Sequence, residues 1–347
     1  MKWTFYPITD FGRNETAWQA INARGANTPL LDPDFVAPML QEFATGHELL
    51  AIYGDTTGSR AMALLVRRKP GVWETFQPPQ APLGCWVSEP SLPLEALLQS
   101  LLQALPGTPL VVGITQQDPD LMPRPGDTGT MVTLDYIQTA RITINKSFDE
   151  YWAARGKNLR HNMKRQRNRL EKENIVPRLE VLTHPNEVAA AIGNYGRLES
   201  AGWKSGMGTA IHPDNAQGRY YKEILERFMR TGDGRIYQYW YGDKLVAIDL
   251  CIQRNGILVI LKTTYDETIT TSSPAFLMRQ DSFKQIFSGH DIRQIEFYGT
   301  LMDWHTKWSE EVRTLYHVNH YRWSILPKLF RKTKITGVRD STLPTSP

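Results

Sequence analysis

The sequence predicts a mixed α/β protein with two domains of similar organisation. A length of 347 residues exceeds the size at which one hydrophobic core stops growing, so two domains are expected. Each half also shows the same order of patterns, three strands, a loop, a helix and a further strand, about 185 residues apart. We place the domains at 1–145 and 146–330, followed by a polar tail at 331–347 that is expected to be disordered.

The elements of the first half follow from periodicity and turn residues. Pro33 after Asp32 opens a short capped helix, in which apolar residues recur at helical spacing. Apolar runs at 48–53 and 61–66 flank a turn sequence, which predicts a hairpin. The remaining elements are a strand at 72–76, an amphipathic helix at 94–105, a strand at 110–114, a loop at 118–129 and an extended segment at 131–144.

The second half begins with one long helix, which Ser147 caps and which Asn174 and Pro177 end. Its apolar stripe continues at helical spacing to Leu170, and a second helix is expected at 186–201. Gly-Asp and Asn-Gly dipeptides then separate three strand patterns, as they do in hairpins. These strands lie at 235–241, 245–253 and 257–265, and a polar loop, a helix opened by Pro274 and a strand at 292–297 follow.

Several classes of protein are disfavoured by composition. No apolar run approaches the ~20 residues of a membrane-spanning helix, and the first residues lack the apolar segment of a secretory signal. Cys85 and Cys251 are far apart, which argues against a disulfide framework and a Cys-based zinc site and agrees with a cytoplasmic location. The sequence has no metal-ligand spacing, no GxSxG and no DNA-binding signature, so we expect no metal and no specific DNA binding.

Positive charge is concentrated in one segment. The chain has 40 basic and 36 acidic residues, net +4, but residues 155–172 hold eight basic residues and one acid, net +7, which leaves −3 elsewhere. Like charges one turn apart, such as Arg160 and Lys164, repel each other, so an anionic partner is expected. Candidates are a nucleotide or lipid-linked substrate, tRNA, or the inner-membrane surface. A solvated face without a partner is the alternative.

Two segments could bind a phosphate group. Residues 271–277 join a strand to a helix with small residues and free helix-start N–H groups, which suits a phosphate, although an ordinary capped helix would look the same. Lys262, in an otherwise apolar strand, needs a surface, a phosphate or a carboxylate as partner.

Two further features offer acid–base chemistry. Asp249 lies in the middle of an apolar strand, so it is either a base with a raised pKa or a structural partner of Arg235, Lys244 or Lys262. Residues 296–308 combine an acid, a phenol, a His, a Lys and two Trp, which could form a substrate wall with a general base or simply pack at a sheet edge.

Six segments of the second half together carry a resemblance to a known family. They are the basic stretch Arg160–Leu170, Glu199–Lys204, Gly242–Ala247, Leu261–Glu267, Ser273–Ala275 and Trp304–Trp308. In this order along the chain they resemble the GNAT-fold acetyltransferases associated with bacterial cellulose and exopolysaccharide synthesis, and more distantly the Fem-type peptidyltransferases. The resemblance implies tandem GNAT-like domains, each a mixed, mostly antiparallel central sheet flanked by helices. Only the second domain is expected to do chemistry.

The resemblance also implies acyl transfer from acyl-CoA, usually acetyl-CoA, directly to an amine or hydroxyl of a small-molecule or saccharide acceptor. Glu296 or Asp249 would be the base, and Tyr298 or Tyr265 the acid. The expected cofactor-binding residues are Leu261, Lys262, Thr263, Thr271, Ser272, Ser273, Pro274, Ala275, Phe276 and Leu277. The expected substrate-binding residues are Glu199, Trp203, Lys204, Arg160, Lys164, Trp304, His305, Lys307 and Trp308.

Two positions depart from the family pattern. Ala275 replaces a Gly, and its Cβ restricts close backbone approach, while His305 replaces a Lys and is only partly charged at neutral pH. These departures keep open an inactive GNAT scaffold that docks on a polysaccharide synthase. The basic helix, which suits tRNA, keeps open an aminoacyl-tRNA-dependent transferase of Fem type. The acceptor, the acyl length and the oligomeric state are left open by the sequence.

Overall fold

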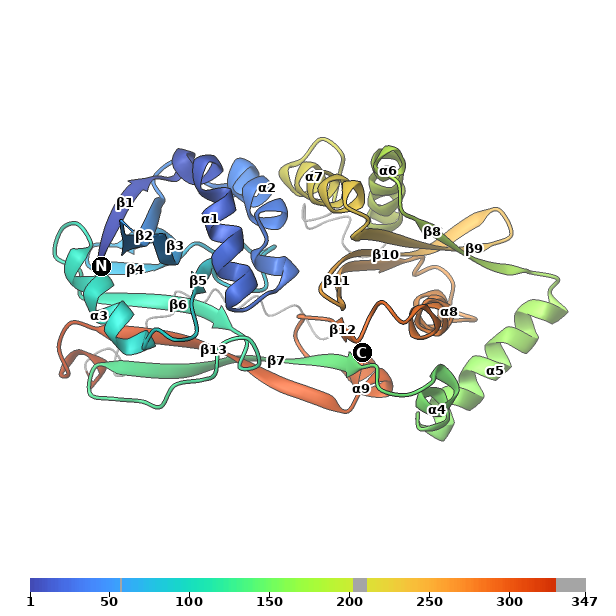
Figure 1. Cartoon of the computed structure of the whole chain (residues 1–347). Helices are drawn as coiled ribbons and strands as arrows, with labels where there is room; N and C mark the ends of the chain where they lie inside the picture. The colour runs from blue at the N-terminus through green and yellow to red at the C-terminus, as the bar shows by residue number, and fades with distance from the viewer. Residues whose placement is uncertain (57, 202–210, 329–347) are drawn as a thin grey trace.

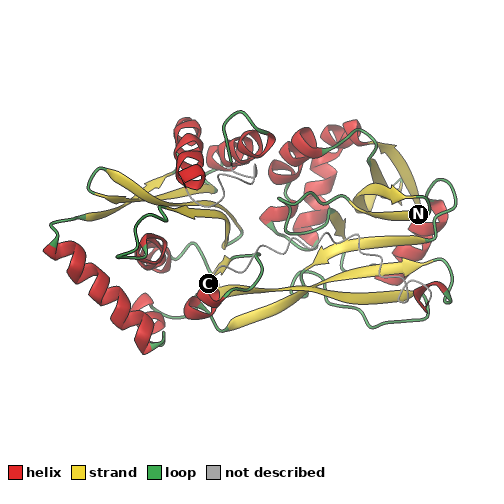
Figure 2. Ribbon diagram, turned by 180° about the vertical axis from the view of Figure 1, so that it is seen from behind, coloured by secondary structure: helices red, strands yellow, loops and turns green. Residues whose placement is uncertain are grey.

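The computed structural model describes residues 1–56, 58–201 and 211–328, and within them strands from both halves form one continuous, mostly antiparallel sheet. Helices cover both faces of this sheet (Figures 1 and 2). The predicted mixed α/β class is therefore confirmed. The predicted tail at 331–347 lies outside the described residues.

The first half contains every element that the periodicity predicted there, in the predicted order. Asp32 caps its helix by accepting a hydrogen bond from the Asp34 N–H, as the Asp-Pro start indicated. The elements are β1 (Lys2–Pro7), α1 (Phe11–Arg24), α2 (Pro33–Phe43), β2 (Leu49–Asp55), β3 (Gly58–Lys69), β4 (Val72–Thr75), β5 (Trp86–Ser88), α3 (Leu94–Ala104) and β6 (Val111–Gln117).

The second half follows after the long strand β7 (Met131–Thr143). Its elements are α4 (Phe148–Ala153), α5 (Lys157–Lys172), β8 (Pro177–Leu182), α6 (Pro185–Ala201), α7 (Ala216–Arg230), β9 (Gly234–Tyr241), β10 (Lys244–Arg254), β11 (Ile257–Tyr265), α8 (Pro274–Gly289), β12 (Gln294–Glu296), α9 (Asp303–Trp308) and β13 (Glu311–Tyr321). The strands β9, β10 and β11, the helix α8 and the strand β12 repeat the order β2, β3, β4, α3, β6, which confirms the repeated order; the first half adds the short strand β5 between β4 and α3.

The prediction of one long helix after Ser147 is wrong. The helix is broken between α4 and α5, because Gly156 adopts an extended conformation with ψ 136° as the N-cap of α5. The apolar stripe nevertheless stays on one side, since Phe148, Leu159 and Leu170 all enter the same hydrophobic core.

The two halves exchange their last strands. The strand order across the middle of the sheet is β6-β13-β7-β12. β7, which ends the first half, therefore pairs with β12 of the second, and β13, which ends the second half, pairs with β6 of the first. Strands from before residue 145 thus pair with strands from after it, and the predicted domain boundary does not divide the sheet.

Each half contains one short parallel strand pair. β4 pairs with β6 from Val72–Val111 to Glu74–Gly113, and β11 pairs with β12 from Ile257–Gln294 to Val259–Glu296. Beyond these three-residue registers the strands of each pair separate. In the second half, β11 also carries a bulge at Leu261, where its pairing with β10 shifts by one residue. Bulges re-aim side chains and end pairing, and they are common beside active sites.

The sheet separates two layers of helices. α1, α2, α6 and α7 lie on one face, while α3, α4, α5, α8 and α9 lie on the other (Figure 1). The largest hydrophobic core lies under the first group and draws residues from both halves of the chain. Contacts between α2 and α7, such as Phe35 and Phe43 against Tyr220, hold the halves together on this face.

Candidate functional site

The first candidate feature is the point where β11 and β12 separate. After Val259, β11 continues for six residues to Tyr265, paired with β10 alone among the strands that the structure describes. One edge of this segment is therefore left without a partner among the described strands, from Ile260 through the bulge at Leu261 to Tyr265. The predicted cofactor-binding residues Leu261, Lys262 and Thr263 all lie on it.

The equivalent place in the first half is filled by the protein's own backbone. Gly84 donates its N–H to the Thr115 carbonyl of β6 at 3.1 Å, and Cys85 donates to the Phe76 carbonyl, just after β4, at 3.2 Å. A Cβ at Gly84 would lie 2.5 Å from the Thr115 oxygen, so only glycine fits. The hydroxyls of Thr75 and Thr115 add a direct contact at 2.7 Å.

On the α8 face, the bulged strand meets a buried polar cluster. Thr263 donates its hydroxyl proton to Asp249 Oδ1 at 2.5 Å and accepts a hydrogen bond from Arg279 Nη2 at 2.9 Å. Arg279 Nε lies 3.9 Å from Asp249 Oδ2. Burial raises the pKa of Asp249, while Arg279 and Thr263 oppose the rise. The cationic partner of Asp249 is thus Arg279, whereas Arg235 pairs with Asp291 and Lys244 with Asp266.

Four side chains from three elements meet on the opposite face. Lys262 lies over the Tyr221 ring, with its Nζ 5.8 Å from the centroid. Glu199, at the end of α6, is buried and accepts a hydrogen bond from the Ile211 N–H at 2.8 Å. The hydroxyl of Tyr195 is buried and has no hydrogen-bond partner among the described residues, and burial, followed by the charge of Glu199, raises its pKa well above the ordinary value. The predicted substrate residues Trp203 and Lys204 lie outside the described residues.

Glu296, the last residue of β12, belongs to a buried charge network. Arg313 of β13 donates from Nη2 to Glu296 Oε2 at 2.7 Å, and the same Nη2 lies 2.5 Å from Asp118 Oδ2. Gln294 also donates to Glu296. Burial raises the pKa of Glu296 to about 7, with the charge of Asp118 adding to the rise and Arg313 opposing it. A carboxyl group with this pKa is matched to proton transfer near neutral pH.

The two predicted acids differ in their suitability. Tyr298 has a left-handed backbone, φ 49°, and its hydroxyl donates to Asp118 Oδ2 at 2.8 Å. Burial, followed by the charge of Asp118, raises the pKa of Tyr298 well above its ordinary value, so its proton is held too tightly for a good acid. Tyr265 ends β11 and is 43% exposed, and burial raises its pKa as well.

The start of α8 offers fewer free N–H groups than the sequence suggests. Ser273 donates its N–H to the Gln166 side chain of α5 at 2.8 Å, and Pro274 has none to donate. Phe276 and Leu277 both donate to the Ser273 carbonyl. Among Ser273–Leu277, this leaves the Ala275 N–H without an acceptor in the described part of the chain. Of the other predicted cofactor residues, Thr271 is exposed, Ser272 bonds to the Tyr241 hydroxyl at 2.9 Å, and Leu277 is fully buried in the core.

The aromatic residues of α9 mainly build the fold. Trp308 is fully buried, and its carbonyl accepts hydrogen bonds from the Tyr151 hydroxyl and from Arg155. His305 stacks on Trp304 with centroids 3.5 Å apart, and burial, together with the charge of Arg279, lowers its pKa to about 4. His305 is therefore neutral at pH 7 and cannot take the place of a cationic Lys, whereas Lys307 is exposed.

With this geometry established, comparison with known proteins gives one family match. Residues 157–306 match the family described as an acetyltransferase (GNAT) domain. This half of the chain has the GNAT fold. No curated protein matches the chain.

Solved structures extend the similarity to the whole chain, although at sequence identities that establish fold alone. FemX matches with TM-score 0.58 and 9% identity, covering 95% of this chain and 100% of that one. The C-terminal domain of a putative lysylphosphatidylglycerol synthetase from Agrobacterium fabrum matches with TM-score 0.54 and 12% identity, covering 89% and 92%. A conserved protein of unknown function from Bacteroides thetaiotaomicron matches with TM-score 0.55 and 12% identity, covering 92% and 99%.

The basic helix α5 is the first element of the matched region, and it contacts α8 while most of its charged side chains are exposed. Arg167 pairs with Asp281 of α8 at 2.6 Å, and Arg160 donates to the Arg155 carbonyl at 3.0 Å. A stripe opposite the apolar side is exposed and has no acidic partner among the described residues. It comprises Lys157, His161, Lys164, Arg165 and Lys172. The stripe extends for roughly 22 Å along the helix.

Sequence reasoning missed Arg279, Asp118 and Arg313. A signal for Arg279 did exist, since it lies four residues from both Ala275 and Phe283, on the buried side of α8. A charged residue at a core-facing position is more informative than an exposed one. For Asp118 and Arg313, which lie in a loop and in an unpredicted strand, no local pattern indicates burial.

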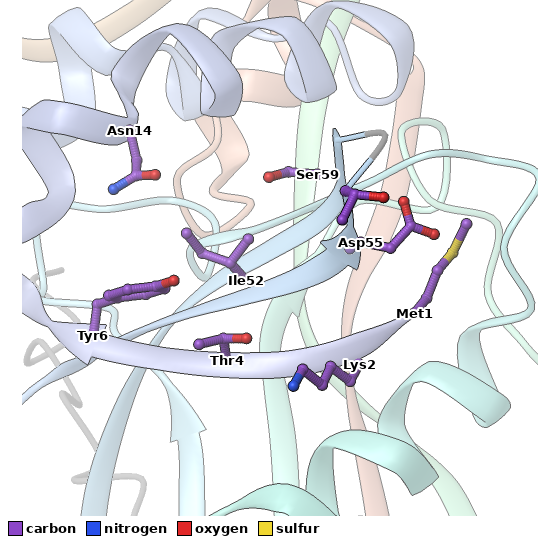
Figure 3. A pocket seen from close by; sticks show the side chains of 10 residues that line it. Met1, Lys2, Thr4, Tyr6, Asn14, Ile52, Asp55 and Ser59 are labelled. Atoms are coloured by element: carbon purple, nitrogen blue, oxygen red, sulfur yellow. The ribbon is translucent and has the colours of Figure 1, made fainter.

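A hollow of about 620 Å³ on the first half contains none of the predicted residues. It lies between β1, β2 and α1, where Lys2, Tyr6, Asn14 and Asp55 contribute side chains (Figure 3). Figure 1 shows these elements at the opposite end of the molecule from α8. The hollow is therefore separate from the GNAT site.

Proposed function

We propose that this chain is an acyltransferase that moves an acyl group, acetyl being the expected one, from acyl-CoA to an amine or hydroxyl. The acceptor class that we propose is a sugar, a polysaccharide precursor or another envelope-related metabolite. The observation that carries the proposal is the edge of β11 beyond Val259, which no other described strand pairs with and which contains the bulge at Leu261. The matching place in the first half is closed by Gly84 and Cys85, which favours a single donor site in the second half.

The donor would extend along this edge, as the resemblance to GNAT enzymes implies. Its thioester would lie near the bulge, and its phosphates near the Ala275 N–H at the start of α8. A second N–H, that of Ser273, becomes available only if the Gln166 side chain moves away. Phosphate binding at a helix start follows from the free N–H groups and the helix dipole.

Transfer needs one base and one proton for the leaving group. Glu296 is the favoured base, because its pKa is about 7, whereas Asp249 is engaged by Thr263 and Arg279 on the other face. Glu296 would accept the acceptor's proton, directly or through water. The acceptor then forms a bond to the thioester carbon, the C–S bond breaks, and the CoA thiolate takes up a proton from Tyr265 or from solvent. Holding both substrates in attack geometry supplies much of the rate.

Calorimetric titration of the full chain with acetyl-CoA tests the proposal. We expect micromolar binding that is lost in Ser273→Glu, because Ser273 is exposed beside the expected phosphates. Ser288→Glu makes the same change at an exposed position near the other end of α8 and should bind normally. Absence of any acetyl-CoA binding by the unmodified chain would overturn the proposal.

A second candidate is an aminoacyl-tRNA-dependent transferase of Fem type. Two observations favour it: the whole-chain similarity in fold to FemX, and the exposed cationic stripe of α5. It predicts tRNA binding that weakens steeply with salt. Lys164→Glu with Arg165→Glu should abolish this binding. Arg67→Glu with Lys69→Glu, an equal charge change at exposed positions of the first half, should not.

The two titrations separate the candidates. Acetyl-CoA binding without tRNA binding supports the acyl-CoA enzyme, and the reverse result supports the Fem-type enzyme. If the chain binds neither acetyl-CoA nor tRNA and co-purifies with a membrane synthase, the result would instead support the scaffold role. For localisation, the structure adds one fact: none of the described helices is long and apolar enough to cross a membrane.

A further inference from the structure

The cluster of Asp249, Thr263 and Arg279 places a buried cation beside the bulged segment of β11. Arg279 is 3% exposed in α8, with its guanidinium carbon 4.1 Å from the centroid of the Trp304 ring. Its Nε is buried without a hydrogen-bond partner in the described structure. A buried donor without a hydrogen-bond partner lowers the free energy of unfolding. A protein with an apolar residue of similar volume at such a site is often as stable or more stable.

The contacts of Arg279 converge on the free edge of β11. Thr263 lies two residues beyond the bulge at Leu261, on the segment that β12 no longer pairs with. Its hydroxyl is held from two sides, because it accepts from Arg279 Nη2 at 2.9 Å and donates to Asp249 Oδ1 at 2.5 Å. Asp249 stands directly opposite Thr263 in the β10–β11 register. The cluster therefore ties α8, β10 and β11 together at one point.

We propose that Arg279 is a positioning residue of the donor site, which acts through Thr263 to hold the free edge of β11 in the conformation that pairs with the donor. This inference rests on the proposed acyl-CoA function. Among the described strands only β10 pairs with β11 beyond Val259, so this edge lacks the hydrogen bonds that a second strand would supply and needs another restraint to fix it. Arg279 and Asp249 supply that restraint from the α8 face and leave the edge itself free for the donor.

The decisive variant is Thr263→Val, which removes the hydroxyl and keeps the β-branched shape that suits a strand. We expect the KM and Kd for acetyl-CoA to rise about tenfold with kcat within about twofold, since a positioning defect of this kind weakens ground-state and transition-state binding alike. Thr264→Val, the same change on the next residue and the opposite face, should leave both constants unchanged.

Arg279→Met and Arg279→Lys extend the test. The Met variant should raise the donor KM as Thr263→Val does, and the Lys variant should recover part of the loss. Combining Arg279→Met with Thr263→Val should add little to either change, because both break the same contact. If Arg279→Met does not fold, the Thr263→Val and Arg279→Lys results decide the matter.

The outcomes distinguish a failure of this inference from a failure of the proposed acyl-CoA function. If the unmodified chain does not bind acetyl-CoA, the proposed function fails, and the inference fails with it. If the unmodified chain binds and Thr263→Val binds equally well, only the inference is overturned. A loss of thermal stability in these variants with an unchanged donor Kd would likewise assign Arg279 a structural role and refute the positioning role.

Discussion

Replacing Glu296 with Gln is the most informative single change in the site. The amide has nearly the same size and can still accept the hydrogen bond from Arg313 Nη2, but it cannot take a proton from an acceptor. The pKa of Glu296 is raised from its ordinary 4.5 to about 7. At ~1.4 kcal/mol per pKa unit, ionising this carboxyl costs about 3 kcal/mol more in the fold than in water.

This pKa determines the expected pH profile. About half of the molecules would carry an ionised Glu296 at pH 7, so kcat/KM should rise through pH 7 and level off about one pH unit above it. General bases contribute on the order of 10²–10⁴-fold to rate, so Glu296→Gln should lower kcat by that factor and remove the rising limb. The assay is release of CoA thiol from acetyl-CoA, with an acceptor that gives turnover, between pH 5.5 and 9.

A second variant tests the cause of the raised pKa. The negative charge of Asp118 contributes to the rise, so Asp118→Asn should move the limb to lower pH. Glu311→Gln, a change of a partly exposed acid of β13, should leave the profile unchanged. The reasoning is wrong if the limb near pH 7 survives in Glu296→Gln, or if that variant keeps its kcat within a few-fold.

Three further predictions concern stability and stoichiometry. Arg313→Leu leaves the buried carboxyls of Asp118 and Glu296 unpaired and should lower the free energy of unfolding by about 3–5 kcal/mol in urea titration. Gly84→Ala forces a Cβ against the Thr115 carbonyl and should cost about 1–3 kcal/mol, while calorimetry should still give one donor site per chain. Because the pKa of Glu296 is raised in the folded state, its contribution to stability is complete below pH 4.5 and is lost as pH rises through about 7. Chemical denaturation of the wild type and Glu296→Gln at pH 5 and pH 8 should therefore show a free energy of unfolding that is higher in the variant, relative to the wild type, at pH 8 than at pH 5.

Local patterns predicted the repeated order of elements, and non-local pairing escaped them. The hairpins of β9, β10 and β11 follow from Gly-Asp and Asn-Gly turns between apolar runs. The exchange of β7 and β13 joins segments more than 150 residues apart, and periodicity shows which face of a strand is buried but not which strand is its neighbour. The bulge at Leu261 is likewise invisible in the sequence, because the residues around it keep an ordinary strand pattern.

The candidate site could likewise be predicted only where a local pattern indicates a residue. Asp249 and Lys262 were identifiable because acids and amines are costly inside apolar strands, and Glu296 because it belongs to a group of polar and aromatic residues at 296–308. Their roles depend on partners that arrive through the fold. Arg279 engages Asp249 on the α8 face, and Arg313 reaches Glu296 from the exchanged strand.

These partners give the first half of the chain a specific part in the chemistry. Its own donor position is closed by Gly84 and Cys85, yet it supplies Asp118, the neighbouring charge that helps to raise the pKa of Glu296. Asp118 and Glu296 share Arg313, which the exchange of β13 delivers between them. Two carboxylates facing one guanidinium leave one negative charge in excess, and one carboxyl therefore tends to keep its proton near neutral pH. The strand exchange thus couples the first half of the chain to the acid–base chemistry proposed for the second, and the pH shift expected in Asp118→Asn measures that coupling.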